Sequence, residues 1–406
     1  MEAKDIRHRR LGNQRIECGG KDSASSIQTS RKDKSGSKDS HTNSQGLSPA
    51  ALVSWMGGVQ AQHYGMSKWA IGLRLQTANA KSPACTQSLI EKALDEGVIL
   101  RTHIMRPTWH LVAAEDLLWL LKLTAPGIQR FLFSRDKIVG IQAKEYLKAN
   151  KVIQKVLEKE PALTRELLLE RLKSYKLPLD EYRKNHYLIH AELEGLICSG
   201  PAEGKKTTYA LVAERLGKQF DELESLAGKL SRKEATARLA LRYFQSHGPA
   251  TLQDFQWWSG LQITLIRSAM ALVADQLQAT DFDGQTYWQT GQTPLSGQPV
   301  QKSSGCCYLL PAFDEYLISY KDRSAVIDSM HSSKAFTLNG IFRPVVVFRG
   351  QVVATWDKTI QKNGMKLELR PFAPMAATFA KEARRAAEMY SRFVEAPITD
   401  FSILTP

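Results

Sequence analysis

One order of hydrophobic and polar positions occurs three times along the chain. Each time, apolar residues at helical spacing are followed by two short strand-like runs separated by a polar turn. A helix followed by strand, turn and strand is typical of the end of a winged-helix domain. The helix and paired-strand stretches are 86–97 with 98–112, 185–195 with 196–212, and 263–276 with 277–290. Because a helix with a hairpin is a common local pattern, three unrelated pieces remain an alternative.

Cap and turn residues sharpen this prediction. Ser48 is placed to cap a helix whose first position is Pro49, and Gly97 is placed to end the helix over 86–97. Asp283 and Gly284 predict a two-residue hairpin turn in the third copy. Further helices are expected ahead of the repeated units, over 6–16, 162–175 and 248–260, and the last of these resembles the start of a helix-turn-helix.

The pattern changes near residue 291. Strand-like runs over 306–320, 342–359 and 366–372 precede a final helix over 373–393. We therefore expect an α+β fold with three tandem winged-helix domains and a β-rich, barrel-like C-terminal domain. The expected boundaries are 1–135, 136–215, 216–290 and 291–406, and the polar, aliphatic-poor stretch 19–46 predicts a disordered insertion in the first domain.

Charge points to a polyanionic partner. The chain has a formal net charge of +14, and its ten Lys/Arg against six Asp/Glu in residues 1–46 supply only +4 of it. The rest of the chain therefore keeps +10, which favours binding to nucleic acid. A merely basic protein without such a partner is the alternative.

The cysteines and the apolar runs limit the class of protein further. The chain has five cysteines, an odd number, and no C-x-x-C pair for zinc. No run of about 18 apolar residues predicts a membrane helix. We expect a cytoplasmic, nucleoid-associated monomer with no metal or cofactor.

Gln60-Ala61-Gln62 is the first candidate site. Two side chains at i and i+2 diverge on a helix and share a side only where the backbone is extended or a helix ends. Gly57 and Gly58 make such a break plausible. By composition alone, two surface glutamines are the simpler interpretation.

Thr108-Trp109-His110 is the second candidate. Strand alternation places Thr108 and His110 on one face and Trp109 on the other. Arg101, His103 and Arg106 surround them in the sequence and suit contact with DNA phosphates. A half-buried hairpin whose histidine meets a backbone carbonyl is the alternative.

Asp314 and Glu315 are the third candidate, as a carboxylate pair for a metal-dependent nuclease. Adjacent acids more often comprise one paired with an arginine and one solvated. The stretch 200–207 superficially resembles a phosphate-binding loop, but it has three residues between its glycines where that motif needs four. The pair Trp257-Trp258 is expected in the core rather than as a stacking surface.

Five stretches resemble the winged-helix DNA glycosylase family that contains AlkZ and YcaQ. They are 6–16, 57–75, 99–121, 309–324 and 339–356. The resemblance implies a C-shaped array of three winged helices that binds DNA in its concavity. It implies catalysis by a Gln-Φ-Gln motif of the AlkZ-type branch, here Gln60 and Gln62, and a Thr-Φ-His motif facing the DNA, here Thr108 and His110. Lys68 lies in the same matched stretch and is expected to contact DNA.

The implied reaction is hydrolysis of the N-glycosidic bond of alkylated, N7-substituted purines or interstrand-crosslinked bases in double-stranded DNA. An N7-alkylated purine is cationic, so its bond to the sugar is already weakened and the transition state resembles an oxocarbenium ion. Amide oxygens then need only to position a water. The alternative is a non-catalytic winged-helix protein, either a transcription regulator or a damage binder, since this fold is commoner among regulators.

Overall fold

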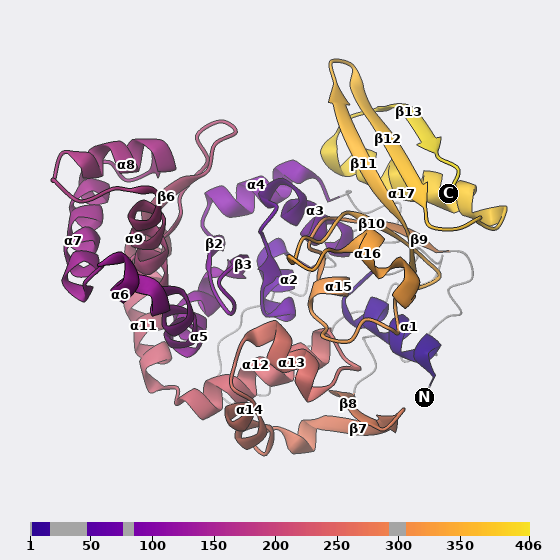
Figure 1. Cartoon of the computed structure of the whole chain (residues 1–406), viewed down its shortest axis with the longest axis horizontal. Helices are drawn as coiled ribbons and strands as arrows, with labels where there is room; N and C mark the ends of the chain where they lie inside the picture. The colour runs from indigo at the N-terminus through magenta and orange to yellow at the C-terminus, as the bar shows by residue number, and fades with distance from the viewer. Residues whose placement is uncertain (1, 17–46, 76–84, 292–305) are drawn as a thin grey trace, which may run out of the picture.

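The computed structural model describes residues 2–16, 47–75, 85–291 and 306–406. The predicted insertion 19–46 lies outside these ranges. Helices and strands are mixed along the chain. Figure 1 shows the helices α7–α9 and the strands β11–β13 at opposite ends of the molecule, with β2 and β3 between them and α12–α14 below. The N-terminal helix α1 (Ala3–Asn13) lies beside the C-terminal region.

One order of elements recurs three times in the described residues. Each repeat has a helix, a short extended segment, two more helices and an antiparallel hairpin. The first comprises α2 (Pro49–Met56), β1 (Val59–Gln60), α3 (Tyr64–Leu75), α4 (Gln87–Asp95), β2 (Ile99–His103) and β3 (Trp109–Ala113). The second comprises α7 (Ala143–Lys159), β4 (Leu163–Thr164), α8 (Arg165–Lys173), α9 (Glu181–Leu193), β5 (Ile197–Ser199) and β6 (Thr208–Leu211). The third comprises α12 (Arg232–Ser246), α13 (Leu252–Ser259), α14 (Ile263–Met270), β7 (Leu277–Phe282) and β8 (Gln285–Thr290).

The three small sheets share one strand arrangement. Their orders are β1-β3-β2 and β4-β6-β5, with the second strand of the hairpin in the middle. In the third repeat, Ala250 takes the place of the outer strand through a single bridge to Trp288 of β8. The three paired-strand predictions are therefore confirmed. The turn at Asp283-Gly284 is also confirmed, since both residues have positive φ, as a tight hairpin turn of this type requires.

Helix ends follow the predicted signals. The Ser48 hydroxyl accepts a hydrogen bond from the Ala51 amide at 3.2 Å, and Pro49 is the first residue of α2. Gly97, at φ 78°, follows the last turn of α4. The helix predicted over 162–175 is shorter than expected, because Leu163 and Thr164 pair with β6 instead.

Linking helices connect the repeats. After the first come α5 (Leu117–Leu132) and α6 (Asp136–Val139), and after the second come α10 (Val212–Leu216) and α11 (Phe220–Lys229). Short 3₁₀ turns lie at Ala114–Asp116, Phe133–Arg135, Gly217–Gln219, Ala274–Gln276 and Ser329–His331.

The C-terminal region is a five-stranded sheet of order β13-β12-β11-β10-β9. Its elements are β9 (Cys307–Leu310), α15 (Glu315–Ile318), α16 (Ser332–Ala335), β10 (Val345–Phe348), β11 (Gln351–Gln361), β12 (Gly364–Pro371), α17 (Thr378–Val394) and β13 (Ile398–Ile403). Three expectations fail here. The sheet is open rather than barrel-like, because its edge strands β9 and β13 do not pair with each other. The run 306–320 is a strand only up to Leu310 and then forms α15, which the Asp314 side chain caps. The final helix does not close the chain, because β13 follows it and pairs parallel with β12.

The hydrophobic cores cross the boundaries between repeats. One core joins α2–α4 to the C-terminal sheet and α17, where the Trp69 ring lies 5.2 Å from that of Tyr390 and 5.0 Å from that of Phe393. A second core joins the hairpin of the first repeat to the third repeat, and a third core fills the second repeat. The first repeat is therefore held between the third repeat and the C-terminal region.

Candidate active site

Three polar side chains stand side by side across the sheet of the first repeat. In the strand register, Gln60 of β1 is opposite His110 of β3, and His110 is opposite Thr102 of β2. Residues directly opposite on neighbouring strands project from the same face of a sheet. All three are buried, with 4% of Gln60 exposed and none of His110 or Thr102. We call Gln60, His110 and Thr102 the polar row.

Each member of the polar row has a buried polar atom without a hydrogen-bond partner among the described residues. These atoms are Gln60 Oε1, His110 Nε2 and Thr102 Oγ1. The turn between β2 and β3 contains further buried polar atoms without a partner among the described residues, namely Thr108 Oγ1 and two guanidinium nitrogens of Arg106. Leaving a buried polar group unpaired costs about 1–3 kcal/mol, so such a concentration marks a place for solvent or a ligand.

The backbone around the glutamines has the predicted form. Gly57 ends α2 with φ 72°, and Gly58 has φ 133° before the chain becomes extended at Val59 and Gln60. The Ala61 amide continues the sheet by donating to the Trp109 carbonyl at 2.7 Å. Gln62 follows at a bend and is exposed. The segment therefore begins in the buried polar row and ends at the surface.

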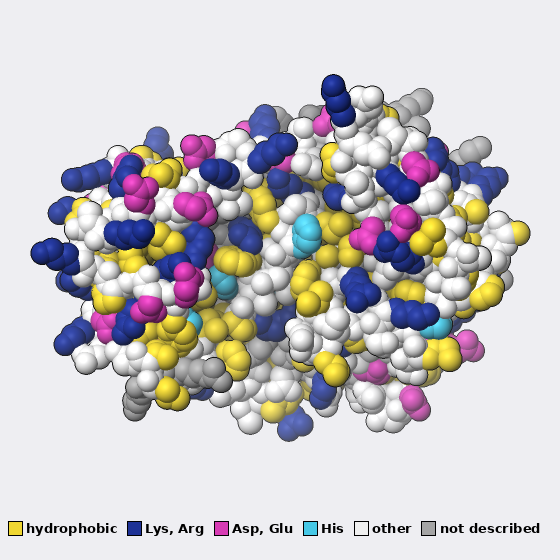
Figure 2. Space-filling view, turned by 45° about the horizontal axis from the view of Figure 1, so that its top comes forward, with side chains coloured by type: hydrophobic (Ala, Val, Ile, Leu, Met, Phe, Trp, Pro, Cys, Tyr) yellow, Lys and Arg dark blue, Asp and Glu magenta, His cyan; other side chains and the backbone are white. Residues whose placement is uncertain are grey.

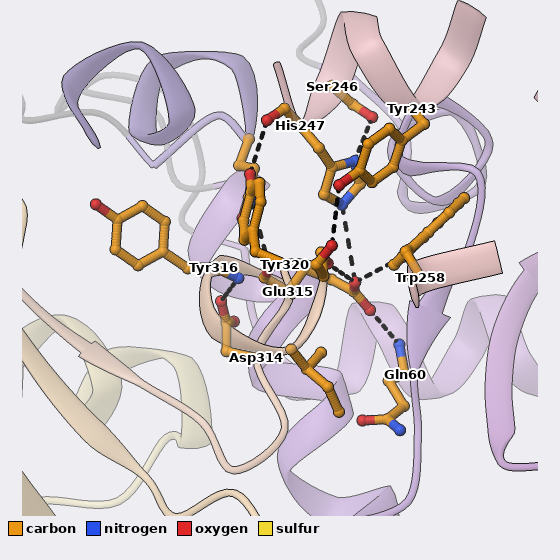
Figure 3. Close-up of polar contacts among 12 residues, drawn as sticks. Gln60, Tyr243, Ser246, His247, Trp258, Asp314, Glu315, Tyr316 and Tyr320 are labelled. Carbon is orange, nitrogen blue, oxygen red and sulfur yellow. Dashed lines mark hydrogen bonds and ion pairs between the residues drawn. The ribbon is translucent and has the colours of Figure 1, made fainter. Parts of the chain in front are cut away.

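A buried carboxylate from the C-terminal region supports this strand. Glu315 is 1% exposed, and its Oε1 accepts a hydrogen bond from the Gln60 backbone amide at 2.7 Å. Its Oε2 accepts from Trp258 Nε1 at 3.1 Å and from the Ser319 hydroxyl. Figure 3 shows the Gln60 backbone nitrogen facing this carboxylate while the side-chain amide points away from it.

The carboxylate is held in its ionised form. Burial raises the pKa of Glu315, but the positive charge that His247 carries when protonated and the hydrogen bond from the Ser319 hydroxyl lower that pKa by more, to about 2. His247 Nε2 lies 3.7 Å from Glu315 Oε2, and burial lowers the pKa of His247. The site therefore contains a fixed negative charge that sequence analysis did not predict for this place.

Asp314 forms a buried salt bridge with an arginine, whereas Glu315 forms none with the arginines that the structure describes. Both of its oxygens accept from the Arg74 guanidinium, at 2.8 and 2.9 Å, and both partners are buried. The prediction of one acid paired with an arginine is confirmed, but the prediction that the other is solvated is wrong, because Glu315 is enclosed by its donors. The carboxylates of this pair face separate protein partners rather than one shared ion. Within the described residues, no three His, Cys, Asp or Glu side chains form a group that could hold a metal ion.

The hairpin residues lie partly as expected. His110 Nδ1 is 3.0 Å from the Thr108 carbonyl, which leaves Nε2 directed into the site. Burial lowers the pKa of His110 to about 4, so the imidazole is neutral at pH 7. Arg101 donates to the Ala61 carbonyl at 3.2 and 3.3 Å, and its guanidinium lies 4.3 Å from the Trp109 ring centre. Arg101 thus fastens the Gln60–Gln62 segment to the hairpin.

Two of the predicted DNA contacts are engaged within the protein. His103 is buried and its Nδ1 contacts Glu192 of the second repeat. Lys68 Nζ lies 2.7 Å from Glu91 Oε1, and its side chain is 12% exposed. The contact of His103 and Lys68 with DNA stays a prediction. Trp258 is in the core as predicted, whereas Trp257 is 42% exposed.

The face shown in Figure 2 combines two kinds of surface. Lys and Arg side chains, with Asp and Glu among them, are most frequent toward both ends, and the middle is mostly uncharged, with scattered hydrophobic side chains and a few histidine and basic ones. No helix within the described ranges is long and apolar enough to cross a membrane.

The sequence did not predict which residues hold the polar row in place. Glu315, Trp258 and His247 come from the C-terminal region and the third repeat, and in sequence they lie far from Gln60. The one available signal was the matched stretch 309–324, which contains the acid pair without showing what it contacts.

The chain is similar to known proteins of one family. The family described as DNA glycosylase AlkZ-like matches residues 53–393. A curated relative from Streptomyces sahachiroi, named interstrand DNA cross-link repair glycosylase, is 24% identical over 355 residues, covering 85% of this chain and 90% of the relative. The solved structure of Streptomyces sahachiroi DNA glycosylase AlkZ superposes with a TM-score of 0.75 at 21% identity and covers all of both chains, which shows a shared fold. The chain belongs to the AlkZ-like DNA glycosylase family.

Proposed function

We propose that this DNA glycosylase removes cationic, N7-alkylated purines from double-stranded DNA and accepts interstrand crosslinks formed through such bases. Family membership gives the reaction, hydrolysis of an N-glycosidic bond. The curated relative is named for crosslink repair, which supports the larger substrate. The observation that carries the proposal is the unpartnered Gln60 Oε1 beside His110 Nε2 in a buried polar row that leads to exposed Gln62.

In this mechanism the leaving base needs no added proton, because the alkyl group has already made it cationic. The chain has to place a water below the sugar carbon and stabilise positive charge as the bond breaks. Gln60 and Gln62 would accept the two hydrogen bonds that this water donates and so orient it, and the unprotonated Nε2 of the neutral His110 would accept the proton that the water releases as it bonds to the sugar. An amide is a weak base, so the ionised Glu315 behind Gln60 supplies the negative potential that favours the cationic transition state.

The proposed scaffold is three tandem winged helices over 1–135, 136–215 and 216–290, with the C-terminal domain over 291–406. The repeated order of helix, short strand, two helices and hairpin supports this assignment. Arg101, Arg106, Thr108 and His110 all belong to the first hairpin or its turn, which we propose faces the duplex. The repeats differ in sequence, so we propose a monomer that binds DNA along an asymmetric array.

The test is a duplex with one N7-methylguanine, incubated with protein and then treated with alkali. Wild type should give a strand break at the lesion. The double variant Gln60→Ala, Gln62→Ala should bind the same duplex with unchanged affinity and give no break. Gln154→Ala, on the exposed face of α7, is the matched control and should behave as wild type.

The competing function is a damage binder or regulator without catalysis. It would be favoured if wild type bound alkylated and crosslinked duplexes but released no base from either. A denaturing gel that resolves crosslinked from unhooked strands extends the same comparison to the larger substrate.

A further inference from the structure

Two arginines from distant parts of the chain converge on one exposed tryptophan. The Arg106 guanidinium lies 5.7 Å from the centre of the Trp257 ring, and that of Arg323 lies 5.4 Å from it. Arg106 is in the turn of the first hairpin, Trp257 in α13 and Arg323 in the segment after α15. Trp257 Nε1 donates to the Ile318 carbonyl at 2.9 Å, which fixes the ring beside both cations.

The site is rigid on both sides. Arg323 Nε donates to the Leu317 carbonyl at 2.8 Å, and its guanidinium also lies 5.0 Å from the Phe336 ring centre. On the other side, Gly260 ends α13 against the turn, and a Cβ there would lie 2.9 Å from the Met105 carbonyl oxygen. The Arg323 guanidinium and the backbone of the turn that carries Arg106 are thus held in place before anything binds.

Neither arginine has a carboxylate partner among the described residues. Nε and Nη2 of Arg106 and Nη2 of Arg323 are buried donors without an acceptor there. Asp254, the acid that acts most on Arg323, lies 3.7 Å from Arg10 and accepts from the Lys321 and Asp322 amides. Glu315, the acid that acts on Arg106, accepts from Gln60, Trp258 and Ser319 instead. Burial and the positive charge of Arg106 lower the pKa of Arg323 to about 10.

Such an arrangement destabilises the free protein, since two like charges are partly removed from water with no anion between them. Free donors on two planar guanidinium groups match the oxygens of a phosphate diester. Arg106 also lies close enough to His110 and Glu315 to affect their electrostatics, which places this cluster beside the polar row.

We propose that Arg106 and Arg323, which both lie against the Trp257 ring, bind one backbone phosphate of the duplex next to the base being removed. This inference rests on the proposed function for the position of the phosphate, but not on the glycosylase reaction. Arg323 and Trp257 would then be DNA contacts supplied by the C-terminal region and the third repeat, so the duplex would contact these two parts as well as the first hairpin.

The experiment measures binding to an undamaged duplex over a series of salt concentrations. Arg323→Gln should weaken binding about tenfold and reduce the slope of log K against log salt by less than about 1, because Arg106 still neutralises part of the charge of the shared phosphate. Arg323→Lys keeps the charge and should keep most of the slope. Arg385→Gln, on an arginine 62% exposed in α17, is the control and should leave both quantities unchanged.

Arg106→Gln tests the same site from the other element and covers the case in which Arg323→Gln fails to fold. Because both arginines share one phosphate, the double variant Arg106→Gln, Arg323→Gln should lose a slope of about 1 in total, the share of a single phosphate. Folded variants with unchanged affinity and slope would overturn the inference, as would a double variant whose slope falls by about 2. If wild type releases no base while these binding results hold, the proposed reaction fails and the phosphate site stands.

Discussion

The backbone amide of Gln60 donates to the carboxylate of Glu315 at 2.7 Å, across 255 residues of sequence. This bond joins the short strand of the first repeat to the first turn of α15. Because the bond uses the backbone of Gln60, the side-chain amide remains unpartnered at its oxygen. The carboxylate therefore holds the glutamine in place without occupying the group that is proposed to bind water.

Glu315→Gln should lower the single-turnover rate of base release about a hundredfold, since it removes a fixed negative charge behind the polar row. It should also cost about 1–3 kcal/mol of unfolding free energy, because an amide nitrogen would face the donors that now meet oxygen. Glu315→Asp keeps the charge and should recover part of the rate. Rate and urea unfolding are measured together, and duplex affinity should stay unchanged. A loss of stability with a normal rate would make Glu315 purely structural.

Gln60→Leu should separate function from stability. The substitution removes a buried oxygen without a partner, so the free energy of unfolding should stay equal or rise by up to about 1 kcal/mol. Base release should fall below detection. Urea unfolding and the alkaline cleavage assay are done on one preparation. A marked loss of stability would mean that the amide is satisfied in the folded chain and is not free to hold water.

Acid should destabilise the protein partly through His110. Its pKa is about 4 in the folded chain, below the value near 6.5 expected when unfolded, so the unfolded state binds the extra proton first. The stabilisation is complete above pH 6.5 and is lost as the pH falls toward 4, by an amount on the order of 2 kcal/mol. Urea midpoints at pH 7 and 4.5 should therefore differ less for His110→Gln than for wild type. Equal shifts would show that His110 is not the group that titrates.

Gly58→Ala should be among the more costly substitutions in the first repeat. Gly58 has φ 133°, and a Cβ would lie 2.7 Å from the Met105 Cε atom. We expect a loss of about 1–3 kcal/mol from strained backbone and displaced packing, with weaker activity because β1 begins at the next residue. Gly127→Ala is the control: a Cβ there meets nothing within 4 Å in the middle of α5, so stability should stay equal or rise. Melting temperatures of both variants give the comparison.

Base release should continue at an unchanged rate in the presence of excess chelator. Asp314 is committed to Arg74, and Glu315 to Gln60, Trp258 and Ser319. The readout is the alkaline cleavage assay with EDTA, using a magnesium-dependent nuclease as the positive control for chelation. Loss of activity that added Mg²⁺ restores would revive the nuclease hypothesis for the acid pair.

Local features of the sequence determined the repeated elements. Alternating apolar residues around polar turns gave three hairpins, because side chains alternate between faces of a strand. Ser48 with Pro49 and the pair Asp283-Gly284 fixed a helix start and a turn through their own backbone preferences. Gly57 and Gly58 likewise showed that the chain leaves its helix before Gln60. Each of these features depends on neighbours within a few residues.

Tertiary structure decided which of the candidate residues are paired within the protein and which remain free at the site. The sequence predicts His103 and Lys68 as DNA contacts, and only the folded chain shows that Glu192 and Glu91 lie against them. Glu315 became the support of Gln60 only because the C-terminal region packs on the first repeat. Charges and hydrogen bonds act over a few ångströms in space whatever their separation along the chain. A pattern of residues therefore indicates which groups are available, and only packing determines which of them are paired and which remain free to act.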